Sequence, residues 1–223
     1  KNIKKIYGHT LLEWAVKAAL CSKLIDRVFV STDSNEYAKL AKEYGAEAPF
    51  LRPESISDDN SSDYDFVIHA IEEFSKINLY PEHIAHIRPT TPIRDPKKID
   101  EAIVLFQNNQ NYDSLRSVHQ MSESSYKTLE INDGKLTPLS LFNNKGLDVN
   151  APRQNFPNTY HANGYIDILC ADSVKKNKSI HGNNILPFIT NFSLEVDTIE
   201  DLEYLEFLAS NKSDIVKKLF KKK

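Results

Sequence analysis

Two carboxylates stand two residues apart at Glu195 and Asp197, with the apolar Val196 between them. Alternate residues of a strand point to one face, so the two acids would lie side by side with Val196 buried behind them. Like charges this close repel unless a cation lies between them, and Mg²⁺ takes a few carboxylates while keeping phosphate oxygens in its shell. The pattern leaves an alternative open, in which both acids face solvent and Asp197 or Thr198 caps the next helix.

Two arginine-bearing segments could recognise anions. Arg52 precedes the hydroxyl-rich run 57–62, where a guanidinium can hold a phosphate in fork geometry; the alternative is an exposed arginine beside a helix cap at Asn60 or Ser61. Arg88 and Arg94 flank a loop that two prolines stiffen, and this loop fits anion recognition and a structural turn equally well.

Asp167 stands inside the apolar run 164–170. A buried acid demands a partner, so Asp167 is either ion-paired within the structure or part of a site.

Metal clips and covalent hydrolase sites are weakly supported. His83 and His86 are three apart, which on a strand places them on opposite faces. Cys21 and Cys170 lack neighbours at zinc spacing and read as reduced core residues of a cytoplasmic protein. No serine elbow motif is present.

Short strands and helices must position these residues. Hydrophobic spacing predicts helices at 10–23, 34–44, 61–76, 96–108 and 198–209, and strands at 27–33, 83–88, 115–118, 164–170 and 193–197. Their alternation in the first half predicts βαβ units and a parallel sheet with helices on both faces. Ligands bind such sheets outside the carboxyl ends of the strands, which draws attention to residues 31–33 and 88–91.

Residues from about 125 to 160 break this alternation. They contain short strands, turns and the hairpin signal Asn132-Asp133-Gly134-Lys135, which indicates an excursion from the sheet and not a separate domain.

Composition excludes several classes of protein. The 223 residues carry a net charge of −3, so there is no global basic field for nucleic acid. No apolar run approaches the ~20 residues of a membrane span. The basic run 217–223 is interpreted as a solvated helix end, with membrane-surface attachment as the alternative. Only 6 glycines are present, where average usage would give about 16.

Several segments, in this order, resemble the N-acylneuraminate cytidylyltransferase family over nearly the whole chain. The matching segments are Lys1-Asn2-Ile3 with Gly8, Leu11-Leu12-Glu13-Trp14, Val30-Ser31-Thr32-Asp33-Ser34, Leu51-Arg52-Pro53, Arg88-Pro89-Thr90-Thr91-Pro92-Ile93-Arg94, Tyr126-Lys127-Thr128, Pro152-Arg153-Gln154, Asn163-Gly164 and Glu195-Val196-Asp197-Thr198 with Asp201-Leu202.

The resemblance implies a fold and a reaction. The fold is an α/β, nucleotidyltransferase-type (Rossmann-like), mainly parallel sheet flanked by helices. It forms one domain over 1–223, and the inserted arm at 125–160 exchanges with a second subunit in a homodimer. In the reaction, the anomeric hydroxyl of a nine-carbon 2-keto sugar acid attacks the α-phosphate of CTP, giving a CMP-sugar and pyrophosphate.

The same resemblance assigns roles to residues. Lys1 and Asp197 are expected to be catalytic, and Asp197 with Glu195 to hold Mg²⁺. The nucleotide is expected at Lys1, Asn2, Arg52 and Ser62, and the sugar acid at Arg88, Lys127, Arg153, Asn163 and Asp167. Arg153 is the candidate for the substrate carboxylate, because a guanidinium binds it bidentately. Lys127 and Arg153 would reach over from the partner subunit.

This sequence departs from the family pattern at three places. The family usually has a strand and a Gly-rich basic loop just before the Lys-Asn pair, so we expect the phosphate-cradling glycines upstream of Lys1. Glu195 stands where sialic-acid members usually carry Asp. Arg88 and Asp167 stand where they often carry Gln and Tyr, which predicts a sugar acid other than N-acetylneuraminate. The alternatives are a transferase for an eight-carbon acid, like CMP-Kdo synthetase, and a catalytically silent dimeric nucleotide-binding protein.

Overall fold

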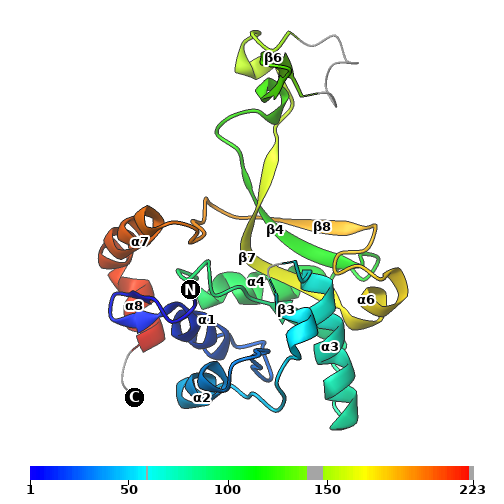
Figure 1. Cartoon of the computed structure of the whole chain (residues 1–223), viewed down its shortest axis with the longest axis vertical. Coiled ribbons are helices and arrows are strands. Elements are labelled where there is room, and N and C mark those ends of the chain that lie inside the picture. Colours follow the sequence, from blue (N-terminus) through cyan, green and yellow to red (C-terminus); the bar gives the residue numbers. More distant parts are fainter. Residues whose placement is uncertain (59, 140–147, 221–223) are drawn as a thin grey trace.

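A four-stranded sheet forms the centre of the computed structural model, which describes residues 1–58, 60–139 and 148–220. Its strand order is β3-β7-β4-β8, with β3 at His83–His86, β4 at Ser114–Gln120, β7 at Tyr160–Cys170 and β8 at Ile185–Ile189. Strand β7 pairs antiparallel with β3 and β4, while β4 and β8 are parallel. Three of these four strands therefore run in one direction, and β7 runs against them (Figure 1).

Helices cover both faces of this sheet. One face packs against α1 (Leu11–Leu20), α4 (Pro96–Gln107), α7 (Ile199–Asn211) and α8 (Ser213–Phe220), around core residues such as Trp14, Ile99 and Leu205. The other face packs against α3 (Asp63–Lys76) and α6 (Ala171–Asn177). Helix α2 (Asn35–Tyr44) packs on α1 in a smaller cluster. The sheet has apolar residues on both faces, and in an α/β fold helices must bury each of them.

Local sequence signals fix most helix ends. Thr10 caps α1 by accepting from the Glu13 N–H, while the Glu13 carboxylate contacts His9 Nδ1. Gly45 ends α2 at φ +102°, a conformation that favours glycine. Full capping boxes open α3 and α7, at Ser62 and Thr198 respectively.

A long arm leaves the body at the ends of β4 and β7 (Figure 1). It carries the hairpin of β5 (Leu129–Asn132) and β6 (Lys135–Pro138), whose turn residues Asp133 and Gly134 both have positive φ. That geometry is the turn which the Asn-Asp-Gly-Lys signal predicts. The body also has a short N-terminal hairpin of β1 (Lys5–Ile6) and β2 (His9–Thr10).

Two segments that were expected to be strands do not form hydrogen-bonded strands in the structure. Residues 27–33 form only an isolated parallel bridge at Phe29 and Glu47, and 193–197 run extended without strand pairing. Both segments carry the apolar residues of a strand, consecutive at 28–30 and alternate at Leu194 and Val196. A strand also needs a neighbour on its edge, and neither segment has a full one. Strand β8 and helix α6 were not expected from the sequence.

Among the residues that the structure describes, no helix is long and apolar enough to cross a membrane. Both cysteines are free thiols, but Cys21 is exposed and Cys170 only partly buried, so the prediction that Cys21 is a core residue is wrong.

Candidate active site

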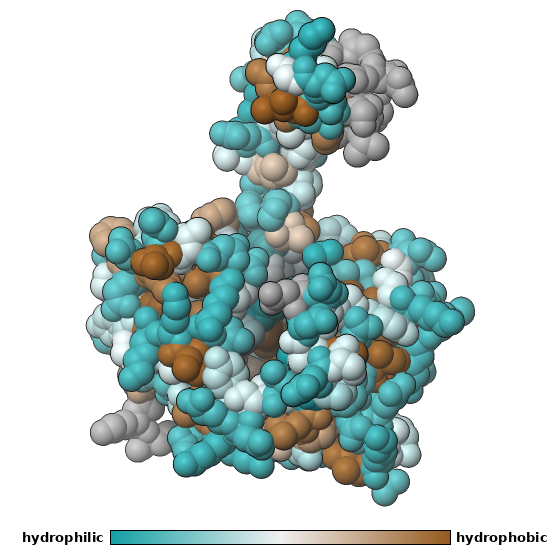
Figure 2. Space-filling model, in the orientation of Figure 1, coloured by the Kyte–Doolittle hydropathy of each residue, from teal (hydrophilic) through white to brown (hydrophobic). Residues whose placement is uncertain are grey.

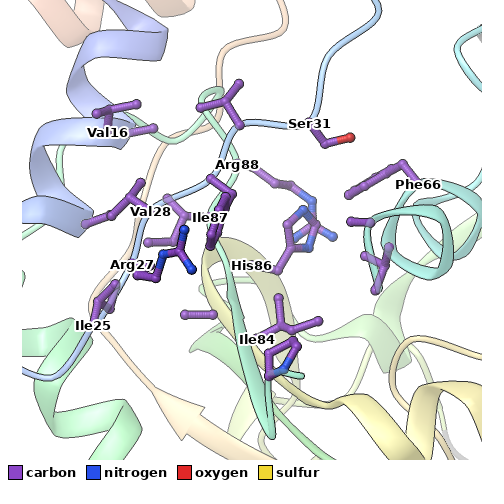
Figure 3. Close-up of a pocket in the computed structure, with 18 of the residues that line it drawn as sticks. Val16, Ile25, Arg27, Val28, Ser31, Phe66, Ile84, His86, Ile87 and Arg88 are labelled. Carbon is purple, nitrogen blue, oxygen red and sulfur yellow. The ribbon is translucent and has the colours of Figure 1, made fainter. Parts of the chain in front are cut away.

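A cavity of about 880 Å³ lies between residues 24–33 and strand β3 (Figure 3). Its inner part is apolar, with Val16 of α1, Val28 and Ile84 on its walls. Its mouth is polar and lies where residues 24–33 and strand β3 end. The polar residues that line the cavity there are Asn2, Ser31, Thr32, Asp33, Arg52, Asp63, Arg88 and Thr90. The expected clusters at 31–33 and 88–91 thus meet at one place, as the strand-end rule requires.

The interior of this cavity has an open backbone edge. The N–H of Val30 donates to the Glu47 carbonyl and that of Glu47 to the Val28 carbonyl, so Phe29 turns its own N–H and C=O to the other side. Across the cavity, β3 pairs with β7 on one side only and ends the described sheet.

Arg88 lies at the mouth, two residues beyond β3, and is clamped by two acids. Its Nη1 donates to Asp167 Oδ2 at 2.8 Å, and its Nη2 donates to Asp63 Oδ2 in a short contact. Burial lowers the pKa of Arg88, but the two carboxylates outweigh it and the pKa lies above its ordinary value. Sequence reasoning placed Arg88 and Asp167 in the site as separate readers of the sugar; the structure joins them as one ion pair.

Asp167 is the buried member of that pair, with a side chain 1% exposed. It lies in β7 opposite His86 and Arg116, and the Arg116 Nε is 4.0 Å from its Oδ1. Of the two interpretations left open for this acid, the structure shows the ion pair. Asp167 does not line the cavity, so its contact with the cavity wall is through Arg88.

No role in this cluster was predicted from the sequence for three of its side chains. Asp63 opens α3, His86 projects from β3, and His181 has its Nε2 3.9 Å from Asp167 Oδ2. Burial, reinforced by Arg88, lowers the pKa of His86 to about 4. Burial also lowers the pKa of His181. Both imidazoles are therefore neutral near pH 7, and the charge of the cluster comes from its arginines and aspartates.

Arg94 ties the loop 88–94 to β7. It is fully buried, and its guanidinium donates to the carbonyls of Arg88, Gly164 and Tyr165 at 2.6–2.8 Å. Of the two interpretations of this loop, Arg94 follows the structural one, while Arg88 stays at the cavity mouth. Gly164 has φ +61°, and a Cβ there would lie 2.9 Å from Thr91 Oγ1, so this close approach requires glycine.

Glu195 and Asp197 flank Val196 in the extended segment that lies beside Thr90 of the cavity wall, and Val196 is buried, as expected. The Val196 N–H donates to the Thr90 carbonyl, and the Thr90 hydroxyl donates to Glu195 Oε1 at 2.7 Å. The ammonium of Lys1 is 2.9 Å from Asp197 Oδ1. The structure thus brings the expected catalytic pair together, and Thr198, not Asp197, caps α7.

The other expected nucleotide residues divide into two groups. Asn2 and Arg52 line the cavity, and Arg52 donates to Ser57 Oγ at 3.0 Å with Phe66 under its guanidinium. Ser62 does not line it: its hydroxyl caps α3 and contacts Asp65 at 2.7 Å.

Asn163 is one of the residues that the resemblance gave to the sugar acid. Its side chain is buried, donating to Thr190 Oγ1 at 2.7 Å and accepting from the Tyr165 N–H. Asn163 therefore shapes the chain beside Gly164, and its amide is already committed.

Lys127 and Arg153 lie together at the arm, away from the cavity. They line a second pocket of about 520 Å³, where Lys127 donates to the Ala151 carbonyl and Arg153 to the Met121 carbonyl, both at 2.9 Å. Within one chain these two cations do not join Arg88, since the arm stands off the body (Figure 1).

An α/β sheet whose strand ends surround a mouth with arginines, hydroxyls and two adjacent carboxylates defines a nucleotidyltransferase-type protein. The family model described as Cytidylyltransferase matches residues 1–150. The chain belongs to this cytidylyltransferase family.

Three relatives illustrate the sequence likeness. An N-acylneuraminate cytidylyltransferase of Escherichia coli O18:K1:H7 is 32% identical over 91% of this chain, which spans about half, 46%, of that relative. The post-translational flagellin modification protein B of Campylobacter coli is 29% identical over 96% of this chain and 89% of its own. A CMP-N,N'-diacetyllegionaminic acid synthase of Legionella pneumophila is 29% identical over 93% and 88%.

Solved structures agree on the fold. A CMP-2-keto-3-deoxy-manno-octonic acid synthetase with CTP superposes with a TM-score of 0.69 at 14% identity, covering 95% of this chain and 92% of that one. A 4-diphosphocytidyl-2C-methyl-D-erythritol synthase gives 0.64 at 11%, covering 93% and 92%.

Proposed function

We propose that this protein transfers CMP from CTP to the anomeric hydroxyl of a nine-carbon 2-keto sugar acid of the sialic, legionaminic or pseudaminic type, releasing pyrophosphate. The observation that carries this is the family match over residues 1–150, because that span contains Asn2, Arg52 and Arg88 at one cavity mouth. Relatives named for sialic and legionaminic acids support the acceptor class.

The mouth suits a reaction that needs positioning and charge neutralisation more than a covalent intermediate. Lys1, Asn2 and Arg52 would bind the nucleotide and its phosphates. Lys1 is half-exposed, so its ammonium can exchange Asp197 for a phosphate oxygen with little cost in solvation. Arg88 would hold the sugar acid against the α-phosphate.

Glu195 and Asp197 fit a magnesium ion that the substrate helps to bind. No group of three or more His, Cys, Asp or Glu suited to a metal occurs in the part of the chain that the structure describes. Mg²⁺ commonly takes only one or two carboxylates and completes its shell with phosphates and water. When bound, the ion would neutralise charge on the phosphates, and these two acids would hold it.

We further propose that the substrate carboxylate is read across a homodimer. Lys127 and Arg153 are cationic and share a pocket on the arm. The hairpin beyond them exposes Leu129, Ile131 and Leu136, whose side chains share one face in the paired register. A lone two-stranded hairpin is marginal in water, so a second copy covering this face would stabilise it and bring the pocket to the partner's cavity.

A pyrophosphate-release assay tests the activity. The protein is incubated with CTP, Mg²⁺ and a panel of eight- and nine-carbon 2-keto sugar acids. Release with a nine-carbon acid other than N-acetylneuraminate is expected, and no release with any acid would reject the enzyme in favour of a silent nucleotide-binding protein. Preference for an eight-carbon acid would favour the CMP-Kdo-synthetase-like alternative. A cytoplasmic location stays a prediction.

Asp197→Ala should lower pyrophosphate release by at least about 100-fold, the scale for loss of one charge-stabilising group. Asp197 is 72% exposed, so the midpoint of thermal unfolding should stay unchanged. Glu200→Gln, an exposed acid in the next helix, is the control and should keep full activity. Unfolding of Asp197→Ala would make Asp197 structural.

A further inference from the structure

The guanidinium of Arg88 is held between two carboxylates, one from the sheet and one from a helix that packs on the sheet. Asp167 comes from the sheet and meets Nη1, while Asp63 comes from the first turn of α3 and meets Nη2. Their exposure differs sharply: the side chain of Asp167 is 1% exposed and that of Asp63 is 40% exposed. Asp63 is therefore the carboxylate that a ligand in the cavity meets, since it also lines the wall.

The charges around Arg88 cancel. Arg88 and Arg116 are the cations of the cluster, and Asp63 and Asp167 its acids. Burial raises the pKa of the Asp63 carboxyl, but Arg88 outweighs it and the pKa lies below its usual value, so Asp63 is ionised at neutral pH. His86 and His181 add no charge there. An anion that approaches Arg88 gains no net attraction and meets the exposed charge of Asp63.

Arg88 nevertheless keeps unused donors. A guanidinium has five N–H groups, and the contacts with Asp167 and Asp63 use one on each terminal nitrogen. The side chain is 21% exposed and lines the cavity beside His86 and Phe66 (Figure 3). A neutral acceptor such as an amide carbonyl or a hydroxyl can take such an N–H without having to displace a carboxylate.

We propose that Asp63 is a specificity-determining residue, which with Asp167 converts Arg88 from an anion receptor into a charge-compensated donor for a neutral oxygen on the sugar acid. This rests on the proposed function. The neutral oxygen belongs to an acylamino or hydroxyl substituent, and the carboxylate of the acid binds elsewhere. Asp63 positions Arg88 and excludes an anionic substituent at the same time.

A matched pair of acids tests the exclusion. One 2-keto sugar acid is prepared with an N-acetyl and with an N-succinyl substituent, and the ratio of their kcat/KM values is measured. Asp63→Asn should reduce the preference for the neutral substituent about tenfold, mainly through KM, since it removes one nearby charge. Asp63→Glu should restore it, and Glu72→Gln on the same helix should leave it unchanged. The comparison between variants cancels the difference in substituent size. An unchanged ratio in a folded Asp63→Asn would overturn the proposal.

A second measurement does not depend on turnover. In ¹⁵N-labelled protein, a guanidinium held on both terminal nitrogens rotates slowly and gives separate Nη resonances, which Arg88→Lys identifies by their disappearance. These resonances should be present in the wild type and lost in Asp63→Ala. Their absence in the wild type would refute the clamp whether or not any acid is turned over. A protein that turns over no acid but shows them would lose the proposed function and keep the clamp.

Discussion

At the residue scale, the site consists of side chains whose neighbours decide their chemistry. His86 is the sharpest case, since it is partly buried in β3 beside Arg88 and the ring of Phe66, and its buried Nδ1 has no hydrogen-bond partner among the described residues. Sequence spacing places His86 and His83 on opposite faces of a strand and so predicts no metal site there. Sequence spacing gave no sign of this environment, because the residues that form it are far apart in the chain. Arg88 is 25 positions from Asp63 and 79 positions from Asp167.

The environment of His86 makes the fold sensitive to acid. Burial holds the pKa of His86 at about 4, below its unfolded value of 6.5. As pH falls below 6.5, the unfolded chain binds a proton that the folded chain does not, so stability is lost down to about pH 4. At pH 5 the loss is about 2 kcal/mol.

Urea unfolding at pH 7 and pH 5 measures this loss, and His86→Phe should remove it from the difference between the two pH values. His83→Phe, on the same strand, is the control and should behave as the wild type. His119 and His181 also have lowered pKa values, so the comparison between variants isolates His86. Equal pH dependence in wild type and His86→Phe would contradict the assignment.

At the element scale, the sequence predicted the helices well and the strands less well. The helices 34–44, 61–76 and 96–108 appear within two residues of their expected bounds, because caps and 3.6-residue periodicity are local. The segment 27–33 does not form a strand, because a strand depends on what lies beside it. Its open edge at Phe29, the open side of β3 and the apolar walls between them have the form of a gap for one more strand.

An extended apolar segment added before Lys1 should therefore fill the cavity as a strand parallel to β3, because Asn2 already lines it. We expect the amides of residues 27–31 and of β3 to become protected from hydrogen exchange, and the midpoint of thermal unfolding to rise.

A designed Val/Ile segment of about six residues, the usual strand length, is the segment to test. The same segment with two prolines is the control, because proline cannot donate to a ladder. Equal protection of these amides from hydrogen exchange with the apolar and the proline segments would show that the cavity does not bind a strand. The whole cavity would then be open to a ligand.

At the scale of the whole molecule, the expected site is divided between two regions. Asn2, Arg52 and Arg88 line the cavity, Glu195 accepts from Thr90 of its wall, and Asp197 pairs with Lys1. Lys127 and Arg153 line the pocket on the arm (Figure 1). Figure 2 shows apolar surface on the end of that arm, where the exposed hairpin residues Ile131 and Leu136 lie. The turn residues in the sequence indicated the excursion. Within one chain, however, Lys127 and Arg153 lie too far from the cavity to act there, so the contribution of a second copy must be tested directly.

Hybrid dimers give that test. Arg153→Ala removes a cation from the arm and Asp197→Ala an acid from the cavity, so each variant alone should be inactive. If every site combines the cavity of one chain with the arm of the other, a hybrid has one site with both defects and one with neither. Random mixing at equal amounts makes about half of the dimers hybrids, which restores about a quarter of wild-type pyrophosphate release. If each chain completes its own site, mixing restores nothing.

Ile131→Asp is the matched control: it places a charge on the apolar face of the hairpin, and should give monomers in sedimentation and abolish the recovery of activity in the mixture.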